Sequence, residues 1–252
     1  DEGQDFGRNE ITGRENQAEI DILDLLKQII LDPDSGNRTF YMFYDKNQMV
    51  QAARVPDYIG EADCKLTLYR NCRNTMNIAE TSVRFLGNGI KSRIREGAAA
   101  GSTPLMYISP EKQNLISALN VIIEKYWEMG ISNIQILTCK TIDTSIISSD
   151  CAGEVYFYKG IQIPFTTCRK FKGLEADAVI LVDMDFNFFK RDENKIYYVG
   201  SSRARHELAL LVTMNDEECR FILNQREKKA GRNPIKVFAS MYNAKILKNE
   251  TN

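Results

Sequence analysis

Histidine is nearly absent from this sequence, and its few cysteines have no metal-binding spacing. There is one histidine, His206, and no Cys-x-x-Cys pair, so a Cys/His zinc site has almost no residues to build it. We expect the cysteines to be reduced thiols, buried as small hydrophobic side chains in a cytosolic protein. They are scattered along the chain as Cys64, Cys72, Cys139, Cys151, Cys168 and Cys219.

The sequence also lacks long apolar runs and any excess of charge of one sign. No run approaches the ~18 apolar residues that a membrane span requires, and no signal peptide opens the chain. We therefore expect a cytoplasmic protein with no membrane partner. Lys and Arg (33) balance Asp and Glu (34), so nucleic-acid binding would need a local basic groove. A length of 252 residues allows one large domain, or one domain with part of another.

A phosphate-binding loop of the form G-x-x-x-x-G-K-[ST] is missing as well. Two segments come near this pattern. Residues 87–92 (GNGIKS) lack a glycine before the lysine, and residues 97–103 (GAAAGST) contain no lysine. This chain therefore has no such loop with which to hold the phosphates of a nucleotide.

What the sequence does contain is an alternation of strand-like and helix-like segments. Apolar β-prone runs predict strands, and apolar residues at helical spacing predict helices between them. This alternation indicates an α/β fold with a mostly parallel sheet flanked by helices. Residues 91–103 are expected to be a loop, and the lysine-rich end a helix or a frayed tail. The expected strands are 39–44, 65–69, 104–108, 134–138, 154–158, 161–167, 177–183 and 207–213, and the expected helices 15–31, 74–86, 110–129, about 193–205 and one from 216.

Two candidate groups lie early in the chain. Asp1 and Glu2 are adjacent acids, of which one can hold Mg²⁺ and the other can orient an attacking water. Gln48 follows the strand expected at 39–44 and can sense a γ-phosphate by hydrogen bonding. Each has a plainer interpretation, as solvated charge at a terminus and as an ordinary loop residue.

Two arginines stand at junctions between predicted elements. Arg73 follows the strand expected at 65–69, where a side chain would reach the carboxyl edge of an α/β sheet. Asn74 or Thr75 beside it could be a simple helix N-cap. Arg203 lies before the strand expected at 207–213 and is expected to reach the same edge. Arginine suits phosphate because its charge is permanent and its fork matches phosphate oxygens.

The segment 167–175 (TCRKFKGLE) is the most informative. It places cations, a glycine and one acid between two strands, and the glycine permits a close backbone approach. Its basic residues and the Thr167 hydroxyl suit the phosphates of a nucleic-acid strand. Glu175 could accept hydrogen bonds from a ribose hydroxyl. The plainer alternative is a charged turn between two strands.

Five segments in order resemble motifs II to VI of superfamily 1 helicases of the UvrD/PcrA type. The resemblance implies a RecA-like P-loop NTPase fold. Residues 1–60 would be the C-terminal remnant of a first RecA-like domain, and 61–252 the second. Because a strand normally precedes the first motif, we expect the chain to be a piece of a longer protein. The five segments are DEGQDF (1–6), FYDKNQ (43–48), LYRNCRNT (68–75), TCRKFKGLEADAVILVD (167–183) and YYVGSSRARHEL (197–208).

The resemblance also implies a role for each candidate residue. Asp1 would hold Mg²⁺, Glu2 would activate water and Gln48 would sense the γ-phosphate. Arg73 and Arg203 would be arginine fingers that stabilise charge on the transferred phosphoryl group. Of the remaining residues, Gly173 and Glu175 would contact the nucleotide, and Thr167, Arg169 and Lys172 the nucleic-acid backbone.

Some residues depart from the family pattern. Tyr44 replaces the usual glycine, and Arg169 stands where a histidine is common. The aromatic residues that stack on bases are absent from 49–53, which leaves stacking there in doubt. Only a short connection follows the strand at 134–138, where UvrD carries a large inserted subdomain. The chain therefore resembles more compact relatives.

The resulting hypothesis is an ATP- and Mg²⁺-dependent helicase or translocase acting on single-stranded or partially duplex DNA. The missing phosphate loop would come from an N-terminal RecA-like domain in cis, so the isolated chain should not hydrolyse ATP. One alternative is a degenerate helicase fold that serves as a nucleic-acid- or protein-binding scaffold. Another is a helicase-like factor directed at RNA or RNA polymerase, because these residues grip backbone and do not separate DNA from RNA.

Overall fold

The computed structural model describes residues 22–32, 34, 36, 38–43, 45, 57–60, 62–67, 70–87, 91–191 and 194–247. The chain divides into two compact units, Asp1–Leu68 and Tyr69–Asn252. In the first unit the structure describes helices α1 (Ile22–Ile30) and α2 (Asp57–Gly60). The division falls at 68/69, and the assignment of 1–60 to a first RecA-like domain remains a prediction.

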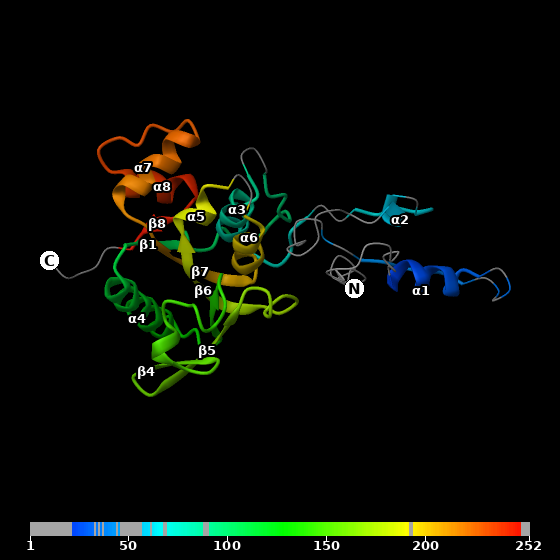
Figure 1. Ribbon diagram of the computed structural model, residues 1–252, viewed down its shortest axis with the longest axis horizontal. Coiled ribbons are helices and arrows are strands. Elements are labelled where there is room, and N and C mark those ends of the chain that lie inside the picture. The colour runs from blue at the N-terminus through cyan, green and yellow to red at the C-terminus, as the bar shows by residue number, and fades with distance from the viewer. Residues whose placement is uncertain are drawn as a thin grey trace, which may run out of the picture. The chain divides into compact units, whose positions relative to one another are not determined.

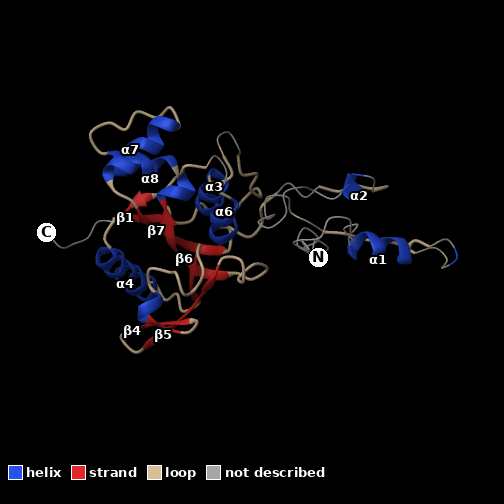
Figure 2. Ribbon diagram, in the orientation of Figure 1, coloured by secondary structure: helices blue, strands red, loops and turns tan. Residues whose placement is uncertain are grey.

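The second unit is built on an eight-stranded sheet of order β3-β4-β5-β2-β6-β7-β1-β8 (Figures 1 and 2). The six strands from β5 to β8 are parallel, whereas β3, β4 and β5 pair antiparallel. The strands are β1 (Leu105–Ile108), β2 (Ile134–Thr138), β3 (Cys151–Ala152), β4 (Val155–Tyr158), β5 (Ile161–Thr167), β6 (Ala176–Asp185), β7 (Ala204–Thr213) and β8 (Lys245–Ile246). The α/β class with a mostly parallel sheet flanked by helices is confirmed.

Helices cover both faces of this sheet, because its central strands alternate buried side chains between the two faces. Apolar residues of α4 pack with Ile136, Ile180 and Leu211 on one face. α6 lies on the other face, so closely that a Cβ at Gly200 would lie 2.6 Å from Leu181 Cδ2 (Figure 1). The helices of this unit are α3 (Met76–Arg84), α4 (Lys112–Glu128), α5 (Phe186–Phe189), α6 (Lys195–Ser201), α7 (Asp216–Gln225) and α8 (Pro234–Met241), with a 3₁₀ turn at Ser148–Asp150.

Most predicted elements of the second unit are confirmed, but two strands predicted near the start of the chain are wrong. Residues 39–43 and 65–67 have no strand structure. Their apolar side chains are exposed, to 77% at Tyr41 and 89% at Leu66. A strand is stabilised by ladder hydrogen bonds to a neighbour, and no strand of the described sheet pairs with these segments. A β-prone composition alone is therefore insufficient to form a strand in these two segments.

The cysteines fit the expectation of buried thiols only in part. All six are free. Cys139, Cys168 and Cys219 are buried, but Cys64 and Cys72 are exposed, which corrects the prediction for those two. Burial raises the pKa of the Cys139 thiol well above its usual value, and the neighbouring Cys168 raises it further. Separately, no helix in the described part of the chain is both long and apolar enough to cross a membrane.

Candidate functional site

Three of the predicted site residues of the second unit, Arg73, Glu175 and Arg203, lie at the amino ends of β6 and β7. Glu175 directly precedes β6, and Arg203 directly precedes β7. Ala176 and Ala204 are register partners, so these two residues enter the sheet side by side. The sequence predicts the arginines at the carboxyl edge, and this prediction is wrong. Glu175 and Arg203 both come before their strands. The chain crosses back along the sheet before it enters β6 and again before it enters β7.

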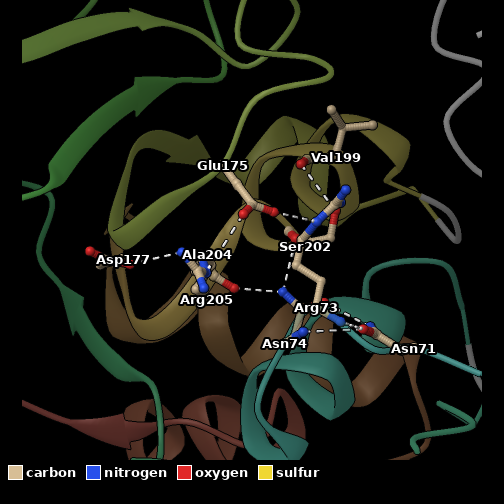
Figure 3. Close-up of polar contacts among 9 residues, drawn as sticks. All are labelled: Asn71, Arg73, Asn74, Glu175, Asp177, Val199, Ser202, Ala204 and Arg205. Atoms are coloured by element: carbon tan, nitrogen blue, oxygen red, sulfur yellow. Dashed lines mark hydrogen bonds and ion pairs between the residues drawn. The ribbon is translucent and has the colours of Figure 1, made fainter.

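An ion-pair network connects Arg73 to this edge of the sheet. Arg73 Nε donates a hydrogen bond of 3.0 Å to Glu175 Oε2, across 102 positions of sequence. Arg205 Nε lies 3.6 Å from Glu175 Oε1, and Arg205 Nη1 lies 3.6 Å from Asp177 Oδ1. Figure 3 shows the Glu175 carboxylate between the two guanidinium groups. These side chains are about 40% exposed, so the network orients them but adds little stability.

Asn74 attaches the 71–75 turn to the start of β7. Its side-chain amide is buried and donates to the carbonyl oxygens of Ser202 at 2.9 Å and Ala204 at 2.5 Å. Asn71 Oδ1 in turn accepts hydrogen bonds from the backbone N–H groups of Arg73 and Asn74 (Figure 3). Asn74 therefore positions Arg73 beside Glu175 by fixing the backbone from which Arg73 extends.

Replacing Asn74 by alanine is expected to lower the free energy of unfolding by about 1–3 kcal/mol, because two buried carbonyl groups lose their donor. Urea denaturation measures this change. Asn224→Ala, at an exposed position of α7, is the matched control and should be nearly neutral. Equal effects of the two substitutions would show that Asn74 does not hold the turn.

The amino end of α3 is capped by backbone carbonyl groups. Met76 N–H and Asn77 N–H donate to the carbonyl oxygens of Ala99 and Ala100 at 3.0 and 3.1 Å. Thr75 occupies the N-cap position, but its hydroxyl makes no capping hydrogen bond. The simple N-cap interpretation therefore fails for the side chains of Asn74 and Thr75. This helix end is closed by the 98–101 loop and does not offer its N–H groups to an anion.

A pocket of about 180 Å³ lies beside the network. Its walls come from the 71–75 turn, the 95–99 loop and the first residues of β7. The charged side chains that line it are cationic, with no carboxylate among the described lining residues. The lining residues are Asn71, Cys72, Arg73, Asn74, Thr75, Arg95, Ala98, Ala99, Arg205 and His206. This chemistry fits an anion of the size of a di- or triphosphate group.

Arg203 differs from Arg73 in its exposure. Its side chain is only 1% exposed and is the largest fully buried side chain among the described residues. It follows α6, whose Gly200 carbonyl accepts the Arg203 backbone N–H at 3.2 Å. Arg205 and His206 are exposed and line the pocket. In the arrangement described here, Arg73 and Arg205 therefore meet the pocket, and Arg203 does not line it.

The segment 168–175 crosses the sheet between two strands. Thr167 ends β5 level with Thr138 and Val182, whereas Glu175 lies at the opposite, amino end of β6. Turns fold this short crossing, with Phe171 N–H donating to the Thr167 carbonyl oxygen at 3.0 Å. Gly173 has φ of +85°, a conformation that favours glycine. The crossing therefore joins one edge of the sheet to the pocket edge.

The predicted nucleic-acid contacts lie along this crossing. Thr167 Oγ1 accepts the backbone N–H of Lys170 at 3.1 Å, which closes the turn after β5. Arg169 is exposed and Lys172 is partly buried, while Cys168 and Phe171 are buried and anchor the crossing to the core. Cations thus project from a segment that is fixed at both ends.

A buried carboxylate organises the carboxyl end of β6. Asp183 is 2% exposed and accepts hydrogen bonds from Thr138 Oγ1, Ser145 Oγ and Ile146 N at 2.5, 2.6 and 2.7 Å. Its φ of +63° is unusual within a strand and coincides with a register shift between β6 and β7. Asp183 therefore fixes the 139–147 loop against the end of β6.

Aromatic rings and cations meet just beyond this strand. The rings of Phe186 and Phe221 lie 5.5 Å apart, edge to face, and Phe221 is 50% exposed. Lys190 Nζ lies 4.2 Å from the centre of the Phe186 ring, and Arg191 stacks on Phe188 at 5.1 Å. We call these five residues the aromatic patch. The sequence prediction did not include this patch, although the run FNFFKR at 186–191 is a signal for it.

Three predicted residues, Asp1, Glu2 and Gln48, lie outside the described residues. Their roles as metal ligand, base and γ-phosphate sensor remain predictions. Among the residues that the structure does describe, no group of three His, Cys, Asp or Glu side chains could hold a metal ion.

Comparisons with known proteins agree with the resemblance seen in the sequence. Residues 163–211 match the family model of the UvrD-like helicase C-terminal domain. This stretch contains the crossing segment, β6, α6 and most of β7. Over this stretch the second unit is similar to the UvrD-like helicase C-terminal domain.

Among solved structures, the chain is similar to the C-terminal domain of a possible DNA helicase from Lactobacillus plantarum WCFS1. The two share 19% identity with a TM-score of 0.44, over 56% of this chain and 86% of the other. None of the curated proteins matches the chain.

Proposed function

We propose that this chain supplies the second motor domain of an ATP-dependent superfamily 1 helicase or translocase. The domain would bind single-stranded nucleic acid at one edge and present arginine to a nucleotide at the other. The phosphate-binding loop would belong to a RecA-like domain in cis. Asp1, in the part of that domain that this chain retains, would hold the Mg²⁺. The isolated chain would therefore bind its ligands without hydrolysing ATP.

One observation carries this proposal. Arg73, Glu175 and Arg205 come from distant parts of the sequence and meet at the amino ends of β6 and β7, beside a pocket lined by guanidinium groups. A fold needs no such gathering for stability, because exposed ion pairs contribute little. Guanidinium groups converging on a cavity suit phosphate oxygens, which they can bind in a bidentate manner.

The residues present fit the phosphate part of ATP. When bound, ATP would supply the free energy of hydrolysis that drives movement. Arg73 would leave Glu175 and turn to the phosphate, an exchange that exposed side chains can make at small cost. Glu175 would then be free to accept a ribose hydroxyl, as the resemblance implies. Gly173, with its positive φ, permits the close approach of the 172–174 backbone.

The nucleic-acid strand would run along the opposite edge of the sheet. Arg169 and Lys172 offer cations to its backbone, and the aromatic patch offers an exposed ring with Lys190 and Arg191 nearby. Aromatic stacking with surrounding cations is how proteins bind single strands without reading sequence. The patch would thus replace the stacking residues that the sequence lacks at 49–53.

The binding of single-stranded DNA tests this interface. Fluorescence anisotropy with a labelled oligonucleotide should show salt-dependent binding. Phe221→Ala should weaken binding about fivefold or more, because one stacked base is worth about 1–3 kcal/mol. Phe157→Ala, which removes an equally exposed ring from β4, should leave affinity unchanged. Equal affinity of wild type and Phe221→Ala would remove the patch from the interface.

A scaffold without ATP turnover is the second candidate, and the burial of Arg203 favours it. A finger must reach the phosphate, and Arg203 is 1% exposed. If the chain is part of a motor, Arg203→Ala in the protein that contains the phosphate loop should abolish most ATP turnover while leaving oligonucleotide affinity unchanged. If the chain is a scaffold, the unmodified protein that contains the phosphate loop should show no ATP turnover.

A further inference from the structure

The pocket beside Arg73 contains a cation for which the sequence motifs give no role. Arg95 lies in the 91–103 loop, outside every segment that resembles the helicase motifs, yet it lines the same pocket as Arg73 and Arg205. We propose that Arg95 binds the terminal phosphate groups of the nucleotide together with Arg73. This inference rests on the proposed function, because it names a further ligand-binding residue in the same site.

The charge balance of the pocket distinguishes Arg95 from its neighbours. Arg73 is paired with Glu175, and Arg205 lies near both Glu175 and Asp177. Within the described residues, no carboxylate pairs with the Arg95 side chain. Glu96, its neighbour in sequence, is exposed and does not line the pocket. Arg95 thus brings a positive charge that the surrounding acids do not neutralise.

Backbone hydrogen bonds build Arg95 into the pocket wall. Asn71 N–H donates to the Arg93 carbonyl oxygen at 2.7 Å, and Arg95 N–H donates to the Asn71 carbonyl oxygen at 3.2 Å. These bonds form an isolated parallel bridge between Asn71 and Ile94. The loop is therefore attached to the same turn that carries Arg73. Arg95 and Arg73 keep a fixed spacing at the level of their backbones.

The next residues of the loop are held as firmly. Ala99 and Ala100 accept the first N–H groups of α3. Gly101, with φ of +70°, packs so closely on Thr75 that an added Cβ would lie 2.4 Å from its side chain. A wall fixed in this way loses little entropy on binding, which favours affinity for a small anion. Because the α3 end is already capped, the pocket attracts anions through its side chains.

The chemistry of the cluster selects the class of ligand. Guanidinium groups from separate segments converge on a pocket of about 180 Å³, which suits two linked phosphate groups better than a carboxylate. Pyrophosphate is therefore the probe, used without Mg²⁺ so that the metal ligands play no part. Isothermal titration calorimetry of the full 252-residue chain at fixed ionic strength measures its affinity.

Arg95→Ala is expected to weaken pyrophosphate binding about tenfold or more, because one charge-assisted contact is lost. Arg95→Lys should lie between the variant and wild type, since lysine keeps the charge without the fork. Arg93→Ala removes the same charge two positions away without touching the pocket lining and should stay within about twofold of wild type. Thermal unfolding of each variant establishes that the exposed substitutions leave the fold intact.

Equal weakening by Arg93→Ala and Arg95→Ala would overturn the proposal, because it would show attraction by overall charge. Absence of pyrophosphate binding by wild type would overturn it too. Oligonucleotide anisotropy on the same samples separates this outcome from failure of the proposed function. If DNA binds and pyrophosphate does not, the role of Arg95 and of the pocket as a phosphate site falls, whereas the proposed nucleic-acid role stands. If pyrophosphate binds and DNA does not, the nucleic-acid role falls.

Discussion

Replacing Arg73 by alanine should lower kcat for ATP hydrolysis about 10³-fold in the protein that joins this chain to a phosphate-loop domain. Arginine fingers contribute effects of this size because they stabilise charge that develops on the transferred phosphoryl group. Arg73 already lies at the pocket, with an exposed side chain that pairs with Glu175. ATP affinity should change much less, because the contact strengthens mainly in the transition state.

Steady-state kinetics with saturating single-stranded DNA separate kcat from KM. Arg73→Lys should recover only part of the rate, because lysine cannot form the bidentate contact. Arg232→Ala, an exposed arginine in the loop before α8, is the matched control and should behave as wild type. A kcat near wild type for Arg73→Ala would remove Arg73 from the reaction.

Replacing Asp183 by alanine should have the largest effect on stability, a loss of about 3 kcal/mol or more. The Thr138 hydroxyl, the Ser145 hydroxyl and the Ile146 N–H would each lose a buried acceptor. Alanine would also keep the unfavourable positive φ of this position. The loop 139–147 should then detach from β6, and oligonucleotide binding at this edge should weaken with it.

Chemical denaturation gives the free energy of unfolding for this comparison. Asp183→Asn retains one acceptor oxygen and should cost less than alanine. Asp143→Ala, on the exposed side of the same loop, is the matched control and should be neutral within about 0.5 kcal/mol. A neutral Asp183→Ala would show that the three hydrogen bonds do not hold the loop.

The sheet of the second unit was predictable because its strands carry their own signal. The apolar runs at 134–138 and 177–183 lie in the core of the sheet, and their bounds agree with β2 and β6 to within two residues. The runs at 39–44 and 65–69 are also β-prone but form no strand over the residues described. Composition reports the tendency of a segment, whereas pairing depends on a partner elsewhere in the chain.

The site was predictable only where a residue belonged to a motif. Arg73 and Glu175 were named from the sequence. Their contact across 102 positions arises because Asn74 attaches the 71–75 turn to the start of β7, beside the start of β6. The predicted position of the arginines at the carboxyl edge of the sheet was wrong, because that prediction followed the general rule that α/β sheets bind ligands at the carboxyl ends of their strands. Arg95 was missed because it belongs to a segment expected only to be a loop.

The role proposed for this domain is to couple nucleic-acid binding to nucleotide hydrolysis in a larger motor. The most direct measurement is the rate of ATP hydrolysis with and without single-stranded DNA, for this chain alone and for the protein that includes its phosphate-loop domain. We predict no turnover by the chain alone, and turnover by the larger protein that DNA raises. Turnover by the chain alone, or a rate in the larger protein that DNA leaves unchanged, would contradict this account.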